Sequence, residues 1–220
     1  MFKLLSWEKV TLIENQVGLI LLIILVLLGS FLSPFFLTPY NLYSILWAVS
    51  VLGIVCLGQA ILLITANFDM SVSMVVPFTG IVTVGAQMAN FGLWSSVMIG
   101  LLVATLIGLI NGFIVVITKA NAFLITFGMQ TLVYAVALIF TQARTWYVSI
   151  PEFHELGRGQ LFGKIHYSVI IFIGMAILLE IMLRYTRTGR YLFVLGANED
   201  AGNRLGLAMI KLKIIAFGFC

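Results

Sequence analysis

Long stretches without a charged residue divide this chain into segments of membrane-spanning length. Residues 15–68, 70–118 and 120–143 contain no Asp, Glu, Lys or Arg, which gives charge-free runs of 54, 49 and 24 residues. Because a membrane-spanning helix needs about 20 mostly apolar residues, the first two runs have room for two spans each and the third for one. Another apolar stretch, 167–183, is interrupted only by Glu180. The pattern therefore predicts six spans, at 17–37, 42–64, 70–90, 93–117, 121–141 and 167–183.

Helices are the expected form of these spans, because a helix in lipid satisfies its own backbone N–H and C=O groups. The predicted fold class is all-α, a polytopic transmembrane helical bundle that forms one domain over residues 1–220. Within it, residues 1–16 precede the first span, residues 17–183 hold the six spans, and residues 184–213 form a polar loop. Residues 214–220 are expected to begin a further span that is incomplete here.

The composition supports the same class. Apolar residues make up 62% of the chain and charged residues 9%, whereas soluble domains have roughly 45–50% and about 25%. A water-soluble enzyme, a disordered chain and a nucleic-acid-binding protein are therefore disfavoured, although the formal net charge is +4. Two cysteines cannot form a disulfide framework.

The basic residues predict the orientation in a cell (inner) membrane. Half of the 12 Lys and Arg residues lie between 184 and 213, and the positive-inside rule makes such a segment cytoplasmic. Counting back through six spans places the N-terminus and Lys119 on the cytoplasmic side and residues 142–166 outside.

Catalytic and cofactor-binding motifs are not found. The stretch 157–165 resembles a phosphate-binding loop, but Arg158 stands where that motif needs glycine and Ile165 where it needs Ser or Thr. His154-Glu155 lacks a second histidine four residues on, so no zinc site is predicted. The chain is therefore not expected to be an enzyme, to hold a metal or cofactor, or to hydrolyse ATP.

Two groups of residues within the spans suggest specific roles. Small residues recur at every fourth position of the fourth span, which predicts a face for close helix packing; these are Ser96, Gly100, Ala104, Gly108 and Gly112.

Asp69 is the one acidic residue between 15 and 151. It either caps the third span at a turn near the cytoplasmic interface or belongs to a pathway for a polar solute. The possible pathway residues are Gln59, Asn67, Asp69, Ser71 and Gln130. Gln87 and Asn111 are further polar residues within spans. The amide side chains within spans can either line the pathway or form hydrogen bonds between helices.

The segment 198–206 carries the signals of a short helix in order. Asn198 is a good N-cap residue, Glu199 and Asp200 suit the positive helix end, Arg204 suits the negative end, and Gly206 can stop the helix. Further back, Glu180 and Arg184 are four residues apart and predict an ion pair on one helix face.

Several stretches together resemble the membrane subunits of bacterial sugar ABC transporters, the permeases for ribose, xylose, galactose and related solutes. The clearest lies in the cytoplasmic loop: Thr186-Arg187-Thr188-Gly189-Arg190-Tyr191, Leu195-Gly196-Ala197-Asn198-Glu199-Asp200-Ala201 and Leu205-Gly206-Leu207. In the same chain order stand Asp69-Met70-Ser71-Val72, Gly108-Leu109-Ile110-Asn111-Gly112, Ala122-Phe123-Leu124-Ile125-Thr126-Phe127-Gly128-Met129-Gln130-Thr131 and Leu156-Gly157-Arg158-Gly159 with Gly163.

The resemblance implies a permease that translocates a sugar or similar small polar solute. It also implies partners: a cytoplasmic ATP-binding subunit, an extracytoplasmic solute-binding protein and a second permease copy or paralogue. The docking helix for the ATPase would lie at 198–206, with Asn198, Glu199, Asp200, Arg204 and Gly206 as its marked residues.

Two departures from the family keep alternatives open. Family members usually have glycines around the Asp69 element, where this chain has Ala66, Asn67, Phe68 and Ser73, and they continue with further spans after the cytoplasmic loop. A branched-chain amino-acid permease and a truncated, non-transporting permease fragment are therefore the alternative functions.

Overall fold

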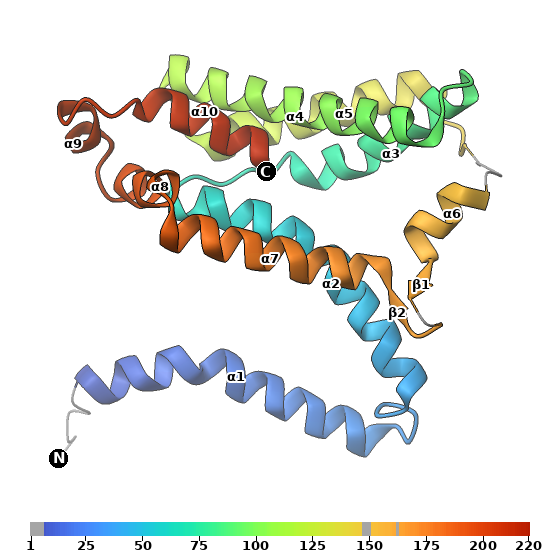
Figure 1. Cartoon of the computed structure of the whole chain (residues 1–220). Helices are drawn as coiled ribbons and strands as arrows, with labels where there is room; N and C mark the ends of the chain where they lie inside the picture. Colours follow the sequence, from blue (N-terminus) through green and yellow to red (C-terminus); the bar gives the residue numbers. More distant parts are fainter. Residues whose placement is uncertain (1–6, 147–150, 162) are drawn as a thin grey trace. The chain divides into compact units, whose positions relative to one another are not determined.

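The computed structural model of the chain describes residues 7–146, 151–161 and 163–220, and these fall into two units, Met1–Ala48 and Val49–Cys220 (Figure 1). The elements, in chain order, are α1 (Trp7–Leu32), α2 (Pro39–Ile64), α3 (Val72–Met88), α4 (Leu93–Thr118), α5 (Ala122–Thr141), α6 (Pro151–Arg158), β1 (Gln160–Leu161), β2 (Ile165–His166), α7 (Tyr167–Tyr185), α8 (Arg187–Ala197), α9 (Glu199–Arg204) and α10 (Met209–Phe219). The fold is all-α, as predicted, except for one two-stranded antiparallel ladder that pairs Gln160 with His166 and Leu161 with Ile165.

The first unit contains α1, a turn and the start of α2. The turn is held by local bonds, since the side chain of Asn41 donates to the backbone oxygen of Phe36 at 2.7 Å. Pro39 is the first residue of α2, a position where the missing N–H costs nothing. Residues 1–6 and the side chains of residues 7–15 lie outside the described residues. The cytoplasmic placement predicted for residues 1–16 therefore stays a prediction.

Among the described residues, four helices are long and apolar enough to cross a membrane: Pro39–Ile64, Leu93–Thr118, Ala122–Thr141 and Tyr167–Tyr185. They match four of the six predicted spans. The other two predictions coincide with shorter apolar helices, Gln16–Leu32 and Val72–Met88. The helix α3 has 17 residues and is therefore about 26 Å long, slightly less than the roughly 30 Å hydrocarbon core of a bilayer.

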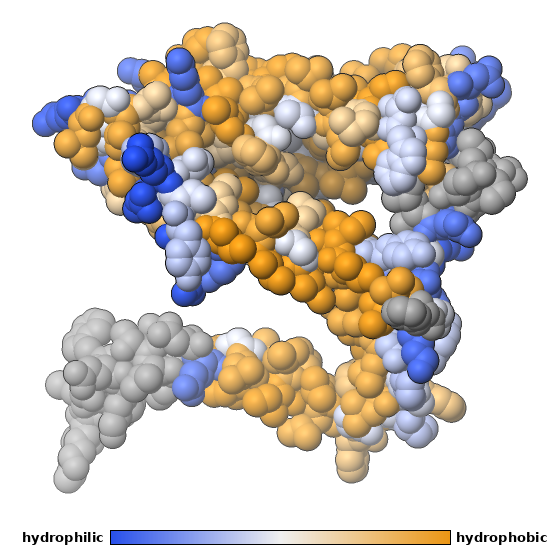
Figure 2. Space-filling model, in the orientation of Figure 1, coloured by the Kyte–Doolittle hydropathy of each residue, from blue (hydrophilic) through white to orange (hydrophobic). Residues whose placement is uncertain are grey.

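Large apolar side chains cover the outside of these helices, as expected for surfaces in contact with lipid. Leu178 of α7, Leu124 of α5 and Leu52 of α2 are all more than half exposed. Figure 2 shows the hydrophobic colour along α7 and the adjoining part of α2. Hydrophilic residues gather near α8 and α9 at one end of these helices and near the end of α5 at the other.

Within the second unit, α4 is the central helix, with α3 and α10 packed against it (Figure 1). Small residues of α4 allow this close approach. A Cβ on Gly100 would overlap the hydroxyl of Thr83 in α3, a Cβ on Gly108 would overlap the backbone oxygen of Phe217 in α10, and one on Gly112 would lie 2.8 Å from Cα of Ile214. The fully buried Phe217 joins residues of α2, α4, α5 and α8 in one hydrophobic cluster.

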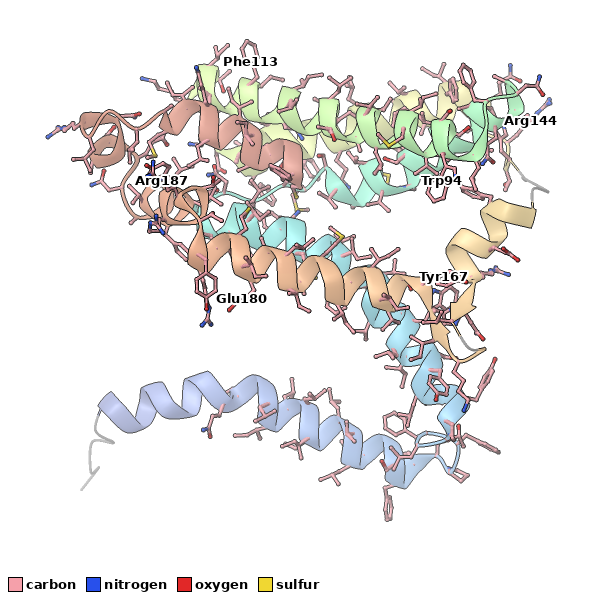
Figure 3. The ribbon with its side chains drawn as sticks, viewed as in Figure 1. Trp94, Phe113, Arg144, Tyr167, Glu180 and Arg187 are labelled. Carbon is pink, nitrogen blue, oxygen red and sulfur yellow. The ribbon has the colours of Figure 1, made fainter. Side chains whose placement is uncertain are left out.

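The connections of the second unit sort into two ends. Figure 3 shows Trp94, Arg144 and Tyr167 at one end and Phe113 and Arg187 toward the other. The residues around Lys119 and the residues of α9 and α10 line a common cavity, so Lys119 and the predicted cytoplasmic loop lie at the same end, as the predicted topology requires. Which end faces the cytoplasm stays a prediction.

Candidate functional site

A non-helical segment between α2 and α3 carries the most deeply buried carboxylate of the described spans. Helix α2 ends at Ile64 and α3 begins at Val72. The backbone N–H groups of residues 65–67 still bond to carbonyls of the last turn of α2, whereas those of Asp69, Met70 and Ser71 bond to side chains. Ala66 has φ +56°, a left-handed conformation that turns the chain back against the helices. Asp69 is 3% exposed and Ser71 is 1% exposed. A charge at such a site is stable only when donors surround it.

Those donors come from the segment itself and from α4. Oδ1 of Asp69 accepts hydrogen bonds from the backbone N–H of Ser71 at 2.7 Å and from its hydroxyl at 2.6 Å. Nδ2 of Asn111, which is fully buried in α4, donates to Oδ2 of Asp69 at 3.2 Å and to the Ser71 hydroxyl oxygen at 2.9 Å. The three side chains form a closed group, which we call the Asp69 cluster.

Two more helices hold the backbone of the same segment. The side chain of Gln59 in α2 donates from Nε2 to the backbone oxygen of Asp69 at 2.5 Å, and its Oε1 accepts from the Asp69 N–H at 3.4 Å. The hydroxyl of Thr126 in α5 accepts from the N–H of Met70 at 2.9 Å. Side chains of α2 and α5 therefore bond to the non-helical backbone at Asp69 and Met70. Partners of this kind are what allow irregular backbone at membrane depth.

The capping role expected for Asp69 needs correction. Ser71, not Asp69, occupies the N-cap position of α3, and no side-chain capping bond forms there. The carboxylate does accept one backbone N–H, but that N–H precedes the helix. The site is also deeper than a turn at the interface, because Asn111 lies seven residues before Thr118, the last residue of α4, which corresponds to about 10 Å. The sequence could not reveal this, since the contact joins residues 42 positions apart.

The other two predicted pathway residues, Asn67 and Gln130, are not bonded to the Asp69 cluster within the described residues. Asn67 donates to the backbone oxygen of Thr65 at 2.6 Å, a bond within its own turn. Oε1 of Gln130 is buried, with no hydrogen-bond partner among the residues that the structure describes. The structure thus brings Gln59, Asp69 and Ser71 together, and across the described ranges no hydrogen bond joins Asn67 or Gln130 to them.

Asn111 and Thr126 are the members of this site that were not among the predicted pathway residues. Asn111 had a usable signal, because it is one of few amides within a span. Thr126 had none, since a threonine in an apolar helix usually bonds to its own backbone, as its hydroxyl also does here with Phe123.

At the end of the bundle that carries α8 and α9, the local structure follows the capping pattern. Helix α9 spans Glu199–Arg204, and Oδ1 of its N-cap residue Asn198 accepts from the N–H of Ala201 at 2.9 Å. Gly206, with φ +75°, follows the helix. Glu199 also pairs with Lys213 of α10, with Nζ to Oε2 at 2.9 Å, which ties α9 to a helix that packs on α4. On α7, Glu180 and Arg184 form the expected ion pair.

A cavity of about 990 Å³ lies between α9 and the non-helical segment. Asn67 and Phe68 contribute from that segment, residues 119–123 from the connection of α4 to α5 and the start of α5, and residues of α9 and α10 from the opposite side. This volume is at the upper end of the range of about 300–1,000 Å³ for small-molecule sites. Because Asn67 and Phe68 line the cavity and Asp69 and Ser71 belong to the Asp69 cluster, the non-helical segment 65–71 contributes to both.

Within the described ranges, no group of three or more His, Cys, Asp or Glu residues is placed to hold a metal ion. The predicted outer loop is described in part: Gly157, Arg158, Gly159 and Gly163 lie within α6 and the strand region that follows, while residues 147–150 and 162 lie outside the described residues.

Comparison with known proteins identifies relatives over most of the chain. A family model described as "Branched-chain amino acid transport system / permease component" matches residues 41–220. The chain is 31% identical over 211 residues to the ribose import permease protein of Escherichia coli (strain K12), covering 94% of this chain and 65% of that protein. It is 28% identical over 205 residues to the L-arabinose ABC transporter permease protein of Azospirillum brasilense, covering 92% of this chain and 60% of that protein.

A third relative is the L-arabinose transport system permease protein of Escherichia coli (strain K12), which is 29% identical over 206 residues, covering 93% of this chain and 62% of that protein. This chain thus spans less than two thirds of the length of these curated relatives. No solved structure matches the chain.

Proposed function

We propose that this chain, which belongs to the family of branched-chain amino acid transport system permease components, is the membrane-spanning permease subunit of an ABC importer for a sugar. The observation that carries the proposal is the likeness to ribose and L-arabinose permeases over more than 90% of the chain. The Asp69 cluster supports it, because a buried ionisable side chain within an apolar bundle is costly and marks functional regions of membrane proteins.

A branched-chain amino acid is the competing substrate, because the description of the family names it. The named relatives favour sugars instead, since their descriptions print ribose and L-arabinose. A non-transporting partner that only assembles with another permease is the third candidate.

The proposed importer has three kinds of partner beside the lipid bilayer of the cell inner membrane: an ATP-binding subunit, an extracytoplasmic solute-binding protein and a second permease copy or paralogue. Helix α9 is the proposed docking element for the ATPase. Its cap at Asn198 stabilises the first turn of the helix, and the ion pair from Glu199 to Lys213 holds the helix against α10. A docking helix has to pass on motion through rigid contacts, and α10 in turn packs on α4, so movement of α9 would reach the centre of the bundle.

Transport is tested with the protein co-expressed with the ATP-binding and solute-binding subunits of a ribose or L-arabinose importer. The complex is purified and reconstituted in proteoliposomes. We expect ATP-dependent uptake of labelled D-ribose or L-arabinose and none of L-leucine. Uptake of L-leucine instead supports the competing substrate. An assembled complex that hydrolyses ATP but accumulates none of the three solutes refutes the proposed importer for pentoses.

Docking is tested with the double variant Asn198→Ala/Glu199→Lys. Loss of the cap costs roughly 1 kcal/mol of helix stability, and a lysine at position 199 replaces the attraction to Lys213 by repulsion. We expect the ATPase to be lost on co-purification while membrane insertion and protein level stay normal. The matched control is Glu180→Lys, which breaks the ion pair with Arg184 on α7, away from α9. Normal ATPase recovery with the double variant contradicts the docking role.

A further inference from the structure

The cavity beside α9 combines free amide groups with apolar rings. Asn121 and Asn198 each use Oδ1 to cap a helix, and Asn67 uses Nδ2 for the oxygen of Thr65. Each of these amides keeps one further polar group, namely Nδ2 of Asn121, Nδ2 of Asn198 and Oδ1 of Asn67, which forms no hydrogen bond among the described residues. The cavity thus offers both donors and acceptors.

Two phenylalanine rings line the same cavity. Phe68 is 39% exposed and Phe123 is 46% exposed, and each stands beside one buried residue, Asp69 and Ala122 respectively. Phe68 lies one residue before Asp69, whose backbone is bonded to Gln59 and whose carboxylate is bonded to Asn111. The backbone that carries the Phe68 ring is therefore held next to the bundle.

The charges around the cavity balance. It is lined by the two cations Lys119 and Lys213 and by the two carboxylates Glu199 and Asp200, and Lys213 is already paired with Glu199. For an anion such as phosphate, repulsion by the two carboxylates would offset attraction by the two ammonium groups. An amino acid would have to compete with the existing ion pair for both of its charges. An uncharged ligand avoids both costs.

We propose that this cavity is a binding site for a neutral, polyhydroxylated solute of pentose size at the α9 end of the transport path, with Asn67, Phe68 and Asn203 among its contact residues. Hydroxyl groups of such a ligand both donate and accept, which matches the free amide groups, and its C–H face packs against an apolar ring. The inference rests on the proposed function and adds the place where the solute is held on the ATPase side of the bundle.

A protection assay on the protein purified in lipid nanodiscs tests the site. In a Cys56→Ser/Cys220→Ser background, Asn203→Cys places a thiol on the cavity wall, since Asn203 lines the cavity. Its backbone oxygen accepts from the N–H of Gly206, but its side chain forms no hydrogen bond within the described residues, so the substitution breaks none. We expect millimolar D-ribose or L-arabinose to slow alkylation of this thiol by a maleimide and L-leucine to have no effect. The matched control is Leu205→Cys, because Leu205 is 75% exposed and does not line the cavity.

Variants at Phe68 test whether protection by the sugar depends on the aromatic ring that lines the cavity. Phe68→Ala in the Asn203→Cys protein should raise the sugar concentration for half-protection about three- to tenfold, the effect of losing one aromatic contact, whereas Phe68→Tyr keeps the ring and should preserve protection. Absence of protection by both sugars, equal slowing in the Leu205→Cys control, or protection unaffected by Phe68→Ala overturns the site. Protection by L-leucine overturns the ligand class.

The uptake assay separates this inference from the proposed function. If the reconstituted complex transports a pentose but the pentose does not protect the Asn203→Cys thiol, the cavity is not a solute site and the importer proposal stands. If the complex transports L-leucine and no pentose, the proposed function itself fails.

Discussion

Exchanging the two partners of the buried carboxylate–amide pair provides the sharpest test of the Asp69 cluster. In Asp69→Asn, the new amide oxygen still accepts from Ser71, but its NH2 group faces Nδ2 of Asn111, so one charge-assisted bond is replaced by two donors in contact. Such a bond is worth about 1.5–3 kcal/mol in soluble proteins, and hydrogen bonds between membrane helices average about 0.6 kcal/mol with a maximum near 1.7.

Because Asp69 is only 3% exposed, the expected loss is slightly above the membrane maximum and within the range for soluble proteins, about 2 kcal/mol. At 2–4 °C per kcal/mol for a chain of this size, the unfolding midpoint of Asp69→Asn should fall by roughly 4–8 °C. Asn111→Asp brings a second carboxylate against Asp69 and should cost at least as much. The double variant Asp69→Asn/Asn111→Asp restores one carboxylate and one amide, with the donor now on the other side, and should recover at least half of the loss.

Thermal unfolding of the purified protein in one detergent, followed by intrinsic fluorescence, measures these shifts. Asp200→Asn is the control, since Asp200 is exposed on α9 and its neutralisation should leave the midpoint unchanged. If the double variant is less stable than either single variant, or if Asp69→Asn unfolds at the temperature of the unmodified protein, the pairing of Asp69 with Asn111 does not stabilise the fold.

Three further predictions concern packing, backbone conformation and topology. Gly108→Leu should prevent recovery of folded protein, because the new side chain would meet the backbone oxygen of Phe217 and overpacking costs about 1–3 kcal/mol. Gly128→Leu, at an open position, should fold normally. Similar yields of folded protein for both variants refute close packing at Gly108. Ala66→Gly should raise the unfolding midpoint by roughly 1–4 °C, because a left-handed residue costs alanine about 1 kcal/mol relative to glycine, and a lower midpoint contradicts the positive φ. Reporter fusions after Lys119 should report cytoplasm and fusions within 151–161 the outside, and the reverse result overturns the orientation.

Features with local causes could be predicted from the sequence. A charge in lipid is costly wherever it stands. The charge-free runs therefore located three of the four long apolar helices to within a few residues, and the apolar stretch around Glu180 located the fourth. The cap of α9 depends on Asn198 and the three residues after it, and the pair of Glu180 with Arg184 depends on one helical turn. Each of these signals lies within a few consecutive residues.

Features that depend on distant partners could not be predicted. Residues 65–71 look like any short connection, and their buried path follows from Asn111, 42 positions after Asp69, and from Thr126, 56 positions after Met70. The small-residue face of α4 was visible, but its contacts with α3 and α10 were not. Similarly, Glu199 and Lys213 are 14 residues apart, a spacing that no single helix brings together.

The segment between α2 and α3 links the buried part of the candidate site to its open part. On one side, Asp69 and Ser71 bond to Asn111 of the central helix; on the other, Asn67 and Phe68 line the cavity next to α9. Seven residues of extended or turning chain are too short to let these two sides move independently. A displacement of α4 relative to α2 would strain the bonds of the Asp69 cluster and shift the cavity wall at the same time. That shared backbone gives the proposed importer a physical route from movement at α9, through α10 and α4, to the place where a solute would be held.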